Sequence, residues 1–187
     1  MKVSRRFLVI VAVLVLALVG EVLLLGNRVD GPGQEERHRR ALRTWSTDRI
    51  IERLGFVGGT DIPEVDELVT RGNQVRVLQR LRTVAADSSE PKASAYATYI
   101  LFRLRDRPRE HLQSLVSRLP DEFQTNGALN GIFSGMLGPQ DVEFVSEVEQ
   151  LLQCDEPFVV ELARRAVANM KATETTSSRS NRESPSE

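Results

Sequence analysis

The apolar positions of this chain begin with a nearly continuous run, which extends from Phe7 to Val19 and resumes from Val22 to Leu25. Taken through Gly26 the run has 20 residues, and a helix of that length is about as long as a bilayer core is thick, about 30 Å. Glu21 opposes insertion by about 2.5 to 3.5 kcal/mol, whereas each apolar residue favours it by about 0.3 to 0.6 kcal/mol. Because 15 Val, Leu, Ile and Phe residues outweigh Glu21, residues 1–26 are predicted to be a transmembrane signal anchor.

A cleaved signal peptide is the alternative interpretation of this segment. Lys2, Arg5 and Arg6 supply its basic start, and residues 15–17 (VLA) are an acceptable cleavage site. Cleavage there would leave an apolar stub at the new amino terminus, which favours the anchor. A short basic tail before an apolar core predicts a single-pass membrane protein with a cytoplasmic amino terminus and an extracytoplasmic domain.

Beyond a turn-rich linker at residues 27–33, apolar positions recur at helical spacing. The first predicted helix covers residues 34–54, and its apolar stripe comprises Ala41, Leu42, Trp45, Ile50, Ile51 and Leu54. Asp61 is placed to cap a second, shorter helix, which has Pro63 in its first turn and ends near Gly72.

Helix-start signals are regular from residue 73 onward. Helices are expected to begin near Asn73 and at five prolines, which are Pro91, Pro108, Pro120, Pro139 and Pro157. No segment alternates with period two, so the fold class is predicted to be all-α. Pairing the helices gives about three hairpins with a repeat of about 30 to 35 residues, a length typical of helical solenoids. The domain at residues 34–170 is therefore expected to be an α-solenoid or a non-repeating helical bundle.

Residues 155–167 read DEPFVVELARRAV, and residues 87–95 (DSSEPKASA) follow the same pattern more loosely. An acidic residue, then proline and valine, with alanines on the inner face, resembles the second helix of short HEAT-like repeats. Glu161 stands where those repeats usually carry arginine. The resemblance covers roughly residues 73–170 and implies stacked helical hairpins.

Charge is strongly segregated along the domain, although the whole chain has a net charge of −1. Residues 71–118 carry ten Lys or Arg and four acids, whereas residues 119–163 carry nine acids and no base. In a solenoid, sequence order is spatial order, so the two stretches are predicted to form separate patches that dock another protein or a second copy head to tail. The alternatives are that both stretches are merely solvated or that they face each other within the fold. The candidate partner-binding residues are Arg103, Arg105, Arg107, Arg109, Asp141, Glu143 and Glu147.

Two further patterns are interpreted as packing. Tyr96, Tyr99 and Phe102 lie near the arginines, but their helical spacing directs them toward the core, and no nucleic-acid partner is expected. Glycines recur every fourth residue at Gly127, Gly131 and Gly135. They predict a helix face that lets the backbone of a neighbour come close; the alternative is a broken helix around a pocket.

Composition and motifs give little support for catalysis. One cysteine excludes an intrachain disulfide, and neither histidine has a nucleophile or metal-ligand partner at a recognisable spacing. We therefore expect no enzyme activity, no cofactor and no metal. Glu64, His111 and Asp141 are the residues to inspect for the alternative of an envelope hydrolase.

The predicted function is a membrane-anchored, non-catalytic protein-interaction or scaffold module of the cell envelope. A peripheral lipid-binding protein is the rival, with a first helix whose membrane-facing side would carry Arg37, Arg39, Arg40, Leu42, Arg43 and Trp45. The interpretation that this helix packs on the domain is preferred, because its apolar stripe continues past the basic cluster. Residues 171–187 lack large apolar side chains and are expected to be disordered.

Overall fold

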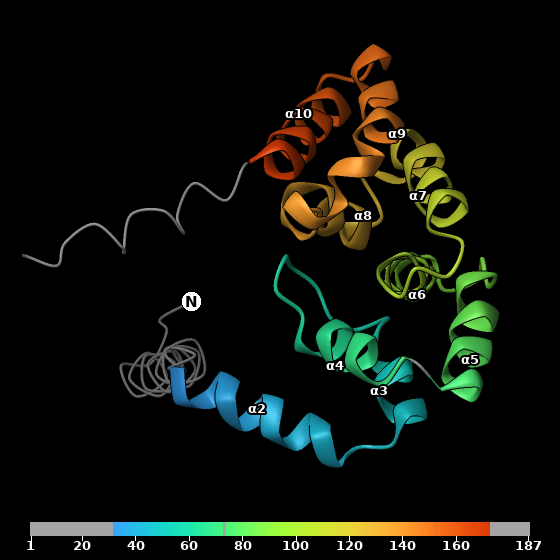
Figure 1. Cartoon of the computed structure of the whole chain (residues 1–187), viewed down its shortest axis with the longest axis vertical. Helices are drawn as coiled ribbons and strands as arrows, with labels where there is room; N and C mark the ends of the chain where they lie inside the picture. Colours follow the sequence, from blue (N-terminus) through green and yellow to red (C-terminus); the bar gives the residue numbers. More distant parts are fainter. Residues whose placement is uncertain (1–31, 73, 173–187) are drawn as a thin grey trace, which may run out of the picture. The chain divides into compact units, whose positions relative to one another are not determined.

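The computed structural model describes residues 32–72 and 74–172, and every regular element in these ranges is helical (Figure 1). The predicted all-α class is thus confirmed for this part of the chain. The predicted anchor, most of the linker and most of the carboxy-terminal tail lie outside the described residues. None of the helices in these ranges has the length and apolar character needed to cross a membrane.

The chain divides into two compact units at the junction of Ala41 and Leu42. The described part of the first unit, residues 32–41, is a stretch of α2 (Pro32–Thr44) with a surface ion pair between Glu35 and Arg39 at 3.0 Å.

The helix predicted over residues 34–54 is two helices in the structure. α2 ends at Thr44, and α3 (Thr47–Arg53) starts after Ser46, whose hydroxyl accepts a hydrogen bond from the backbone N–H of Arg49 at 3.3 Å. A serine that caps in this way starts a new helix at its own position. Leu42, Ile50, Ile51 and Leu54 are all buried, so the prediction that this stripe packs on the domain is confirmed.

α4 (Pro63–Arg71), α5 (Val75–Ala85), α6 (Pro91–Arg103) and α7 (Pro108–Glu122) follow, and the predicted prolines lie in the first turns of α4, α6 and α7. Two details of the prediction are wrong. Ile62, not Asp61, occupies the capping position of α4, and no side chain caps it. Pro120 does not open a helix but lies inside the last turns of α7. Burial of Leu115 and Leu119 on the same helix offsets the hydrogen bond that a proline removes.

The carboxy-terminal third is built from short elements. They are α8 (Gly127–Gly131), the π-helix η1 (Ile132–Met136), the 3-10 helix η2 (Pro139–Phe144), α9 (Val145–Glu149), the 3-10 helix η3 (Gln150–Gln153) and α10 (Pro157–Lys171). α5 contacts α6, and α9 contacts α10, as two of the predicted hairpins require. The hairpin predicted between the helices at Pro108 and Pro120 does not exist, because both prolines belong to α7.

α6 is the central element of the second unit. Ten successive residues, from Ala93 to Phe102, are buried on all sides of the helix, and α6 contacts α3, α4, α5, α7 and α8 (Figure 1). A helix that is surrounded in this way has apolar or small residues on every face. Tyr96, Tyr99 and Phe102 are among them, which confirms that these aromatics face the core.

Candidate functional site

The predicted basic and acidic binding residues contact one another in the structure. Arg105, which follows α6, pairs with Glu143 of η2 at 3.0 Å, and Arg109 of α7 pairs with Glu147 of α9 at 3.2 Å. Arg105 also donates a hydrogen bond to the carbonyl oxygen of Gln140 at 3.0 Å. The prediction of separate patches is therefore wrong for these four residues, and the alternative that the two stretches face each other describes them.

The other three candidates have different surroundings. Arg107 pairs only with the nearby Glu110, at 3.5 Å, and both side chains are about two-thirds exposed. Asp141 is buried and accepts a hydrogen bond from the backbone N–H of Gly138 at 3.2 Å, while its burial raises its pKa. Arg103 is half-buried and donates to the hydroxyl of Tyr99 at 2.9 Å. Of the seven candidates, Arg107 is thus the one arginine left on the surface with only a local partner.

The loop between α6 and α7 holds two arginines in the left-handed backbone region. Arg105 has φ of 59° and Arg107 has φ of 47°, a conformation that is costly for residues with a side chain. Asp106 between them is gripped by two hydrogen bonds from Arg82, at 2.7 and 3.0 Å. The guanidinium of Arg105 also lies 5.2 Å from the ring centre of Phe144. These contacts hold the strained loop in place.

His111 lies beside Asp106, with 3.6 Å between Nε2 and the carboxylate, and is 19% exposed. Burial lowers the pKa of His111, and the opposing influence of Asp106 is smaller. Its Nε2 atom has no hydrogen-bond partner among the described residues, and Asp106 is already engaged by Arg82. The pair has a base and a carboxylate but shows no nucleophile bonded to the base, so it forms no triad in this part of the chain.

The other two residues singled out for inspection serve separate local structures. Glu64 is buried in α4, 3.6 Å from Arg53, and Asp141 holds the start of η2. Neither is a partner of His111 in the contacts described above. These residues do not assemble a hydrolytic site.

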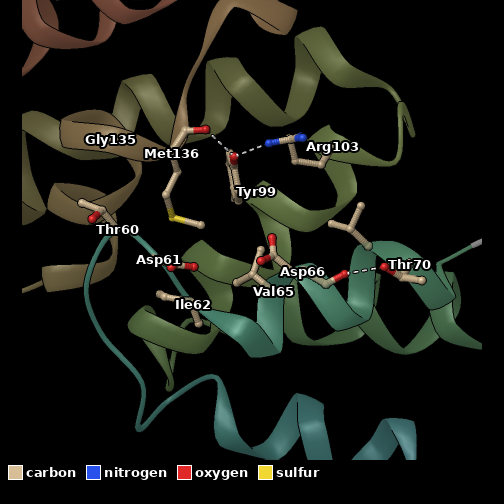
Figure 2. Close-up of a pocket in the computed structure, with 11 residues that line it drawn as sticks. Thr60, Asp61, Ile62, Val65, Asp66, Thr70, Tyr99, Arg103, Gly135 and Met136 are labelled. Atoms are coloured by element: carbon tan, nitrogen blue, oxygen red, sulfur yellow. Dashed lines mark hydrogen bonds between the residues drawn. The ribbon is translucent and has the colours of Figure 1, made fainter. Parts of the chain in front are cut away.

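A cavity of about 350 Å³ lies between α4 with its preceding loop, α6 and η1 (Figure 2). Tyr99 and Arg103 contribute from α6, Gly135 and Met136 from η1, and the α4 side supplies Thr60, Asp61, Ile62, Val65, Asp66, Val69 and Thr70. The hydroxyl of Tyr99 donates to the carbonyl oxygen of Met136 at 2.7 Å. Burial raises the pKa of Tyr99 to about 12, so it is a neutral donor at physiological pH.

Two of the evenly spaced glycines lie close to the loop before α4, and one of them, Gly135, lines the cavity. A Cβ atom on Gly131 would lie 2.2 Å from the carbonyl oxygen of Gly59, and one on Gly135 would lie 3.0 Å from the side chain of Thr60. Gly127 has nothing within 4 Å of its Cβ position. The expectation of a close backbone approach is confirmed at Gly131. The alternative of a broken helix around a pocket also describes this stretch, because α8 gives way to the π-helix η1 and Gly135 lines the cavity. The residues that α4 and α6 contribute were not predicted, because no spacing signal links them.

Of the large apolar side chains in residues 32–72 and 74–172, the most exposed is Phe56, which is 84% exposed in the loop after α3. Gly55, Gly58 and Gly59 surround it in the sequence, and Gly59 has φ of 120°. Two cations lie over the ring of Trp45, with the guanidinium of Arg49 at 4.1 Å and that of Arg53 at 5.7 Å from the ring centre. Phe56 is not one of the binding residues predicted from the sequence.

Comparisons with known proteins do not assign a family. The chain is similar to transcription factor FAMA of Arabidopsis thaliana, with 33% identity over 104 residues, which cover 54% of this chain and 23% of FAMA. The chain thus spans less than a quarter of the length of this curated relative. No model of a protein family matches the chain, and no solved structure matches it.

Proposed function

We propose that the chain is a non-catalytic protein-binding module, tethered to a membrane by residues 1–26 with its helical domain on the extracytoplasmic side. The tether rests on the apolar run of the sequence, and the binding role rests on one observation of the structure, the exposure of Phe56. Four of the seven charged candidate residues form ion pairs with one another within the domain. The proposed docking contact is therefore the apolar side chain of Phe56.

Phe56 has the properties of an interface anchor. Removing a phenylalanine side chain from water is worth about 1.5 to 3 kcal/mol, and interfaces concentrate their binding free energy in a few such anchors. At 84% exposure Phe56 gains almost none of this within the domain. A protein partner that covers the loop at residues 55–59 would gain it. The partner is a different protein or a second copy of this chain.

Electrostatic steering has a smaller part in this proposal than the charge pattern predicted. Arg105 and Arg109 are neutralised by Glu143 and Glu147, so they contribute little field at the surface. Arg107 remains outward, paired only with Glu110. The resemblance to HEAT-like repeats stays a prediction, supported by the α5–α6 and α9–α10 pairs and opposed by the place of Pro120.

Site-specific photo-crosslinking tests the proposal in the full chain in its native membrane. A photoreactive phenylalanine analogue is placed at Phe56 and, as the matched control, at the exposed Gln113 of α7. We expect a protein adduct from position 56 and none from position 113. The absence of a protein adduct at position 56, or equal adducts at both positions, would contradict the proposal.

A lipid-binding role is the second candidate, favoured by the exposed Phe56 and by the cations Arg49 and Arg53 over the ring of Trp45. A lipid-binding surface on the first predicted helix is disfavoured, because Leu42, which would face the membrane there, is 1% exposed. Co-sedimentation of the full chain with anionic vesicles, in wild type and in Phe56→Ser, separates the two roles. Binding that requires Phe56 and tracks anionic lipid content supports the lipid role.

FAMA is a transcription factor, and this chain is similar to only a small part of it. The similarity covers 23% of FAMA. A surface that stacks nucleic-acid bases needs exposed aromatic rings. Tyr96, Tyr99 and Phe102, the aromatics next to the arginine cluster, are each at most 1% exposed.

A further inference from the structure

We propose that the aromatic pair Phe123 and Phe158, at the end of α7 and the start of α10, binds a basic segment of another protein that carries an apolar anchor residue. This is a second interaction surface of the domain, and it does not rest on the role of Phe56. Three properties of the surface support it. They are two stacked rings, nearby carboxylates that form no ion pair among the described residues, and the lack of cations in the same stretch of chain.

The two rings form one apolar surface. Their centres lie 5.7 Å apart at an interplanar angle of 33°, which is within the range of a favourable aromatic pair. Phe123 also packs against the hydrophobic core, whereas Phe158 is 48% exposed. Single apolar side chains are common on protein surfaces, but a ring pair that the core supports offers a larger apolar contact. Such a pair suits a partner that brings an apolar side chain of its own.

Three carboxylates lie close to the rings along the chain. Asp121 precedes Phe123 by two residues, and Asp155 and Glu156 directly precede the first two residues of α10, the second of which is Phe158. Three residues of chain span at most about 11 Å, so each carboxylate lies within about a Debye length of a ring. None of the three carboxylates forms an ion pair with another residue in the ranges 32–72 and 74–172. The surface around the rings is therefore anionic.

The neighbouring cations of α7 and α10 do not neutralise this surface. No Lys or Arg occurs between residues 119 and 163. Arg118 donates two hydrogen bonds to Glu122, at 2.8 and 3.0 Å. Arg165 pairs with Glu161 at 2.9 Å. Arg164 lies six residues beyond the exposed ring, which at 3.6 residues per turn puts it on another side of α10, about 240° around the helix.

The combination of apolar rings and carboxylates selects the partner. A lysine or arginine of a basic segment can pair with the carboxylates while its apolar neighbour covers the rings, and the cation can also lie over the exposed face of Phe158. The same carboxylates repel an anionic lipid surface or a nucleic acid. Residues 173–187 of this chain lack a large apolar side chain, so they cannot supply the anchor.

Isothermal titration calorimetry on the purified full chain in detergent tests the inference with three pentapeptides that have uncharged ends. KKFKK carries both basic flanks and the anchor, KKGKK lacks the anchor, and EEFEE reverses the charge. We expect saturable binding of KKFKK, at least about tenfold weaker binding of KKGKK, and no binding of EEFEE at the same concentrations. No saturable heat with KKFKK at millimolar concentration would overturn the inference, as would equal affinity for KKFKK and KKGKK.

Matched variants assign the binding to this surface. Phe158→Ser should weaken the binding of KKFKK by about tenfold, whereas Val142→Ser, at another exposed apolar residue, should leave it unchanged. Asp155→Asn combined with Glu156→Gln should also weaken it by about tenfold, with the exposed Glu52→Gln of α3 as the unaffected control. Circular dichroism melting confirms that the variants fold. Equal affinity of Phe158→Ser and Val142→Ser would overturn the inference.

Sedimentation velocity of the full chain at several concentrations tests the other occupant, a second copy of this chain. We expect wild type and Phe158→Ser to show the same dependence of sedimentation on concentration. Self-association that Phe158→Ser abolishes would assign the surface to a second copy and overturn the inference.

Discussion

At the scale of single residues, the loop between α6 and α7 shows how a strained backbone conformation can be offset by side-chain contacts. Arg105 and Arg107 both have positive φ, but only Arg105 uses its side chain across the fold, with Glu143, Gln140 and Phe144. Nothing in the sequence marks these two positions, because glycine is the usual residue there. The contacts of Arg105 come from η2, which is distant in sequence, so local reasoning could not find them.

Replacing each arginine by glycine tests this division. Arg107→Gly should raise the free energy of unfolding by about 0.5 to 1 kcal/mol, because it relieves the left-handed backbone and loses only an exposed ion pair. Arg105→Gly relieves the same strain but removes three contacts, and it should be neutral or destabilising. Chemical denaturation of the full chain measures both. Equal destabilisation by the two changes would contradict this account of the loop.

His111 predicts a pH dependence of stability. Burial lowers its pKa in the folded state, so the unfolded chain binds the proton more tightly. The neutral His111 therefore contributes fully to the stability of the fold above the pKa of the unfolded chain, about 6.5. This stability is lost as the pH falls through the lower pKa of the folded state. The charged groups near it are Asp106 and Glu110, which oppose this shift, and Arg107, which adds to it.

Substitution of His111 isolates its effect from those of the carboxyl groups. Burial raises the pKa of Asp141, so its effect on stability has the opposite sign. Its contribution is lost as the pH rises from about 3.8, the pKa of the unfolded chain, through the higher folded pKa. His111→Gln should lose less stability than wild type between pH 7 and about pH 5. Denaturation midpoints of both proteins over this range provide the measurement. Parallel curves would show that His111 does not titrate as described.

At the scale of elements, the sequence predicted where helices begin better than where they are interrupted. Prolines in first turns mark α4, α6, α7 and α10 correctly, because a first-turn proline loses no hydrogen bond. Pro120 carries the same local signal inside a helix, and tertiary packing decides between the two. The break at Ser46 also follows from packing, because helical periodicity continues through it, whereas the glycines at 127, 131 and 135 did indicate a broken helix where the π-turn η1 lies.

The glycine positions give a matched test of this packing. Gly131→Ala should destabilise the domain by about 1 to 3 kcal/mol, because the new Cβ would overlap the carbonyl oxygen of Gly59. Gly127→Ala meets nothing within 4 Å and should stabilise α8 by up to about 1 kcal/mol through helix propensity. Thermal melting of both variants provides the comparison. A neutral Gly131→Ala would contradict the close approach of the loop and α8.

At the scale of the whole domain, charge segregation along the sequence becomes charge pairing in space. The sequence correctly showed two oppositely charged stretches, but a solenoid order would have kept them apart. The short elements after α7 instead bring η2 and α9 against Arg105 and Arg109. The place of a residue along the chain does not predict such a return, because it depends on the path of residues 123–138 through the short helices α8 and η1.

Charge reversal tests the internal pairing. Changing Arg103, Arg105, Arg107 and Arg109 together to glutamate should lower the melting temperature, because Glu143 and the buried Glu147 would then face like charges. Restoring one pair by adding Glu143→Arg should recover part of the loss. An unchanged melting temperature in the quadruple variant would contradict the internal pairing and favour the prediction from the sequence that these arginines form a docking patch.

The most direct test of the central claim compares partner recovery by wild type and Phe56→Ser. Both full chains are purified from detergent-solubilised membranes at low and high salt, and the proteins that accompany them are quantified. An apolar contact at Phe56 predicts a partner that survives high salt with wild type and is lost with Phe56→Ser, while the melting temperature of the variant is unchanged. Recovery of no partner with wild type, or of the same partner with Phe56→Ser, would contradict a protein-binding role for this surface.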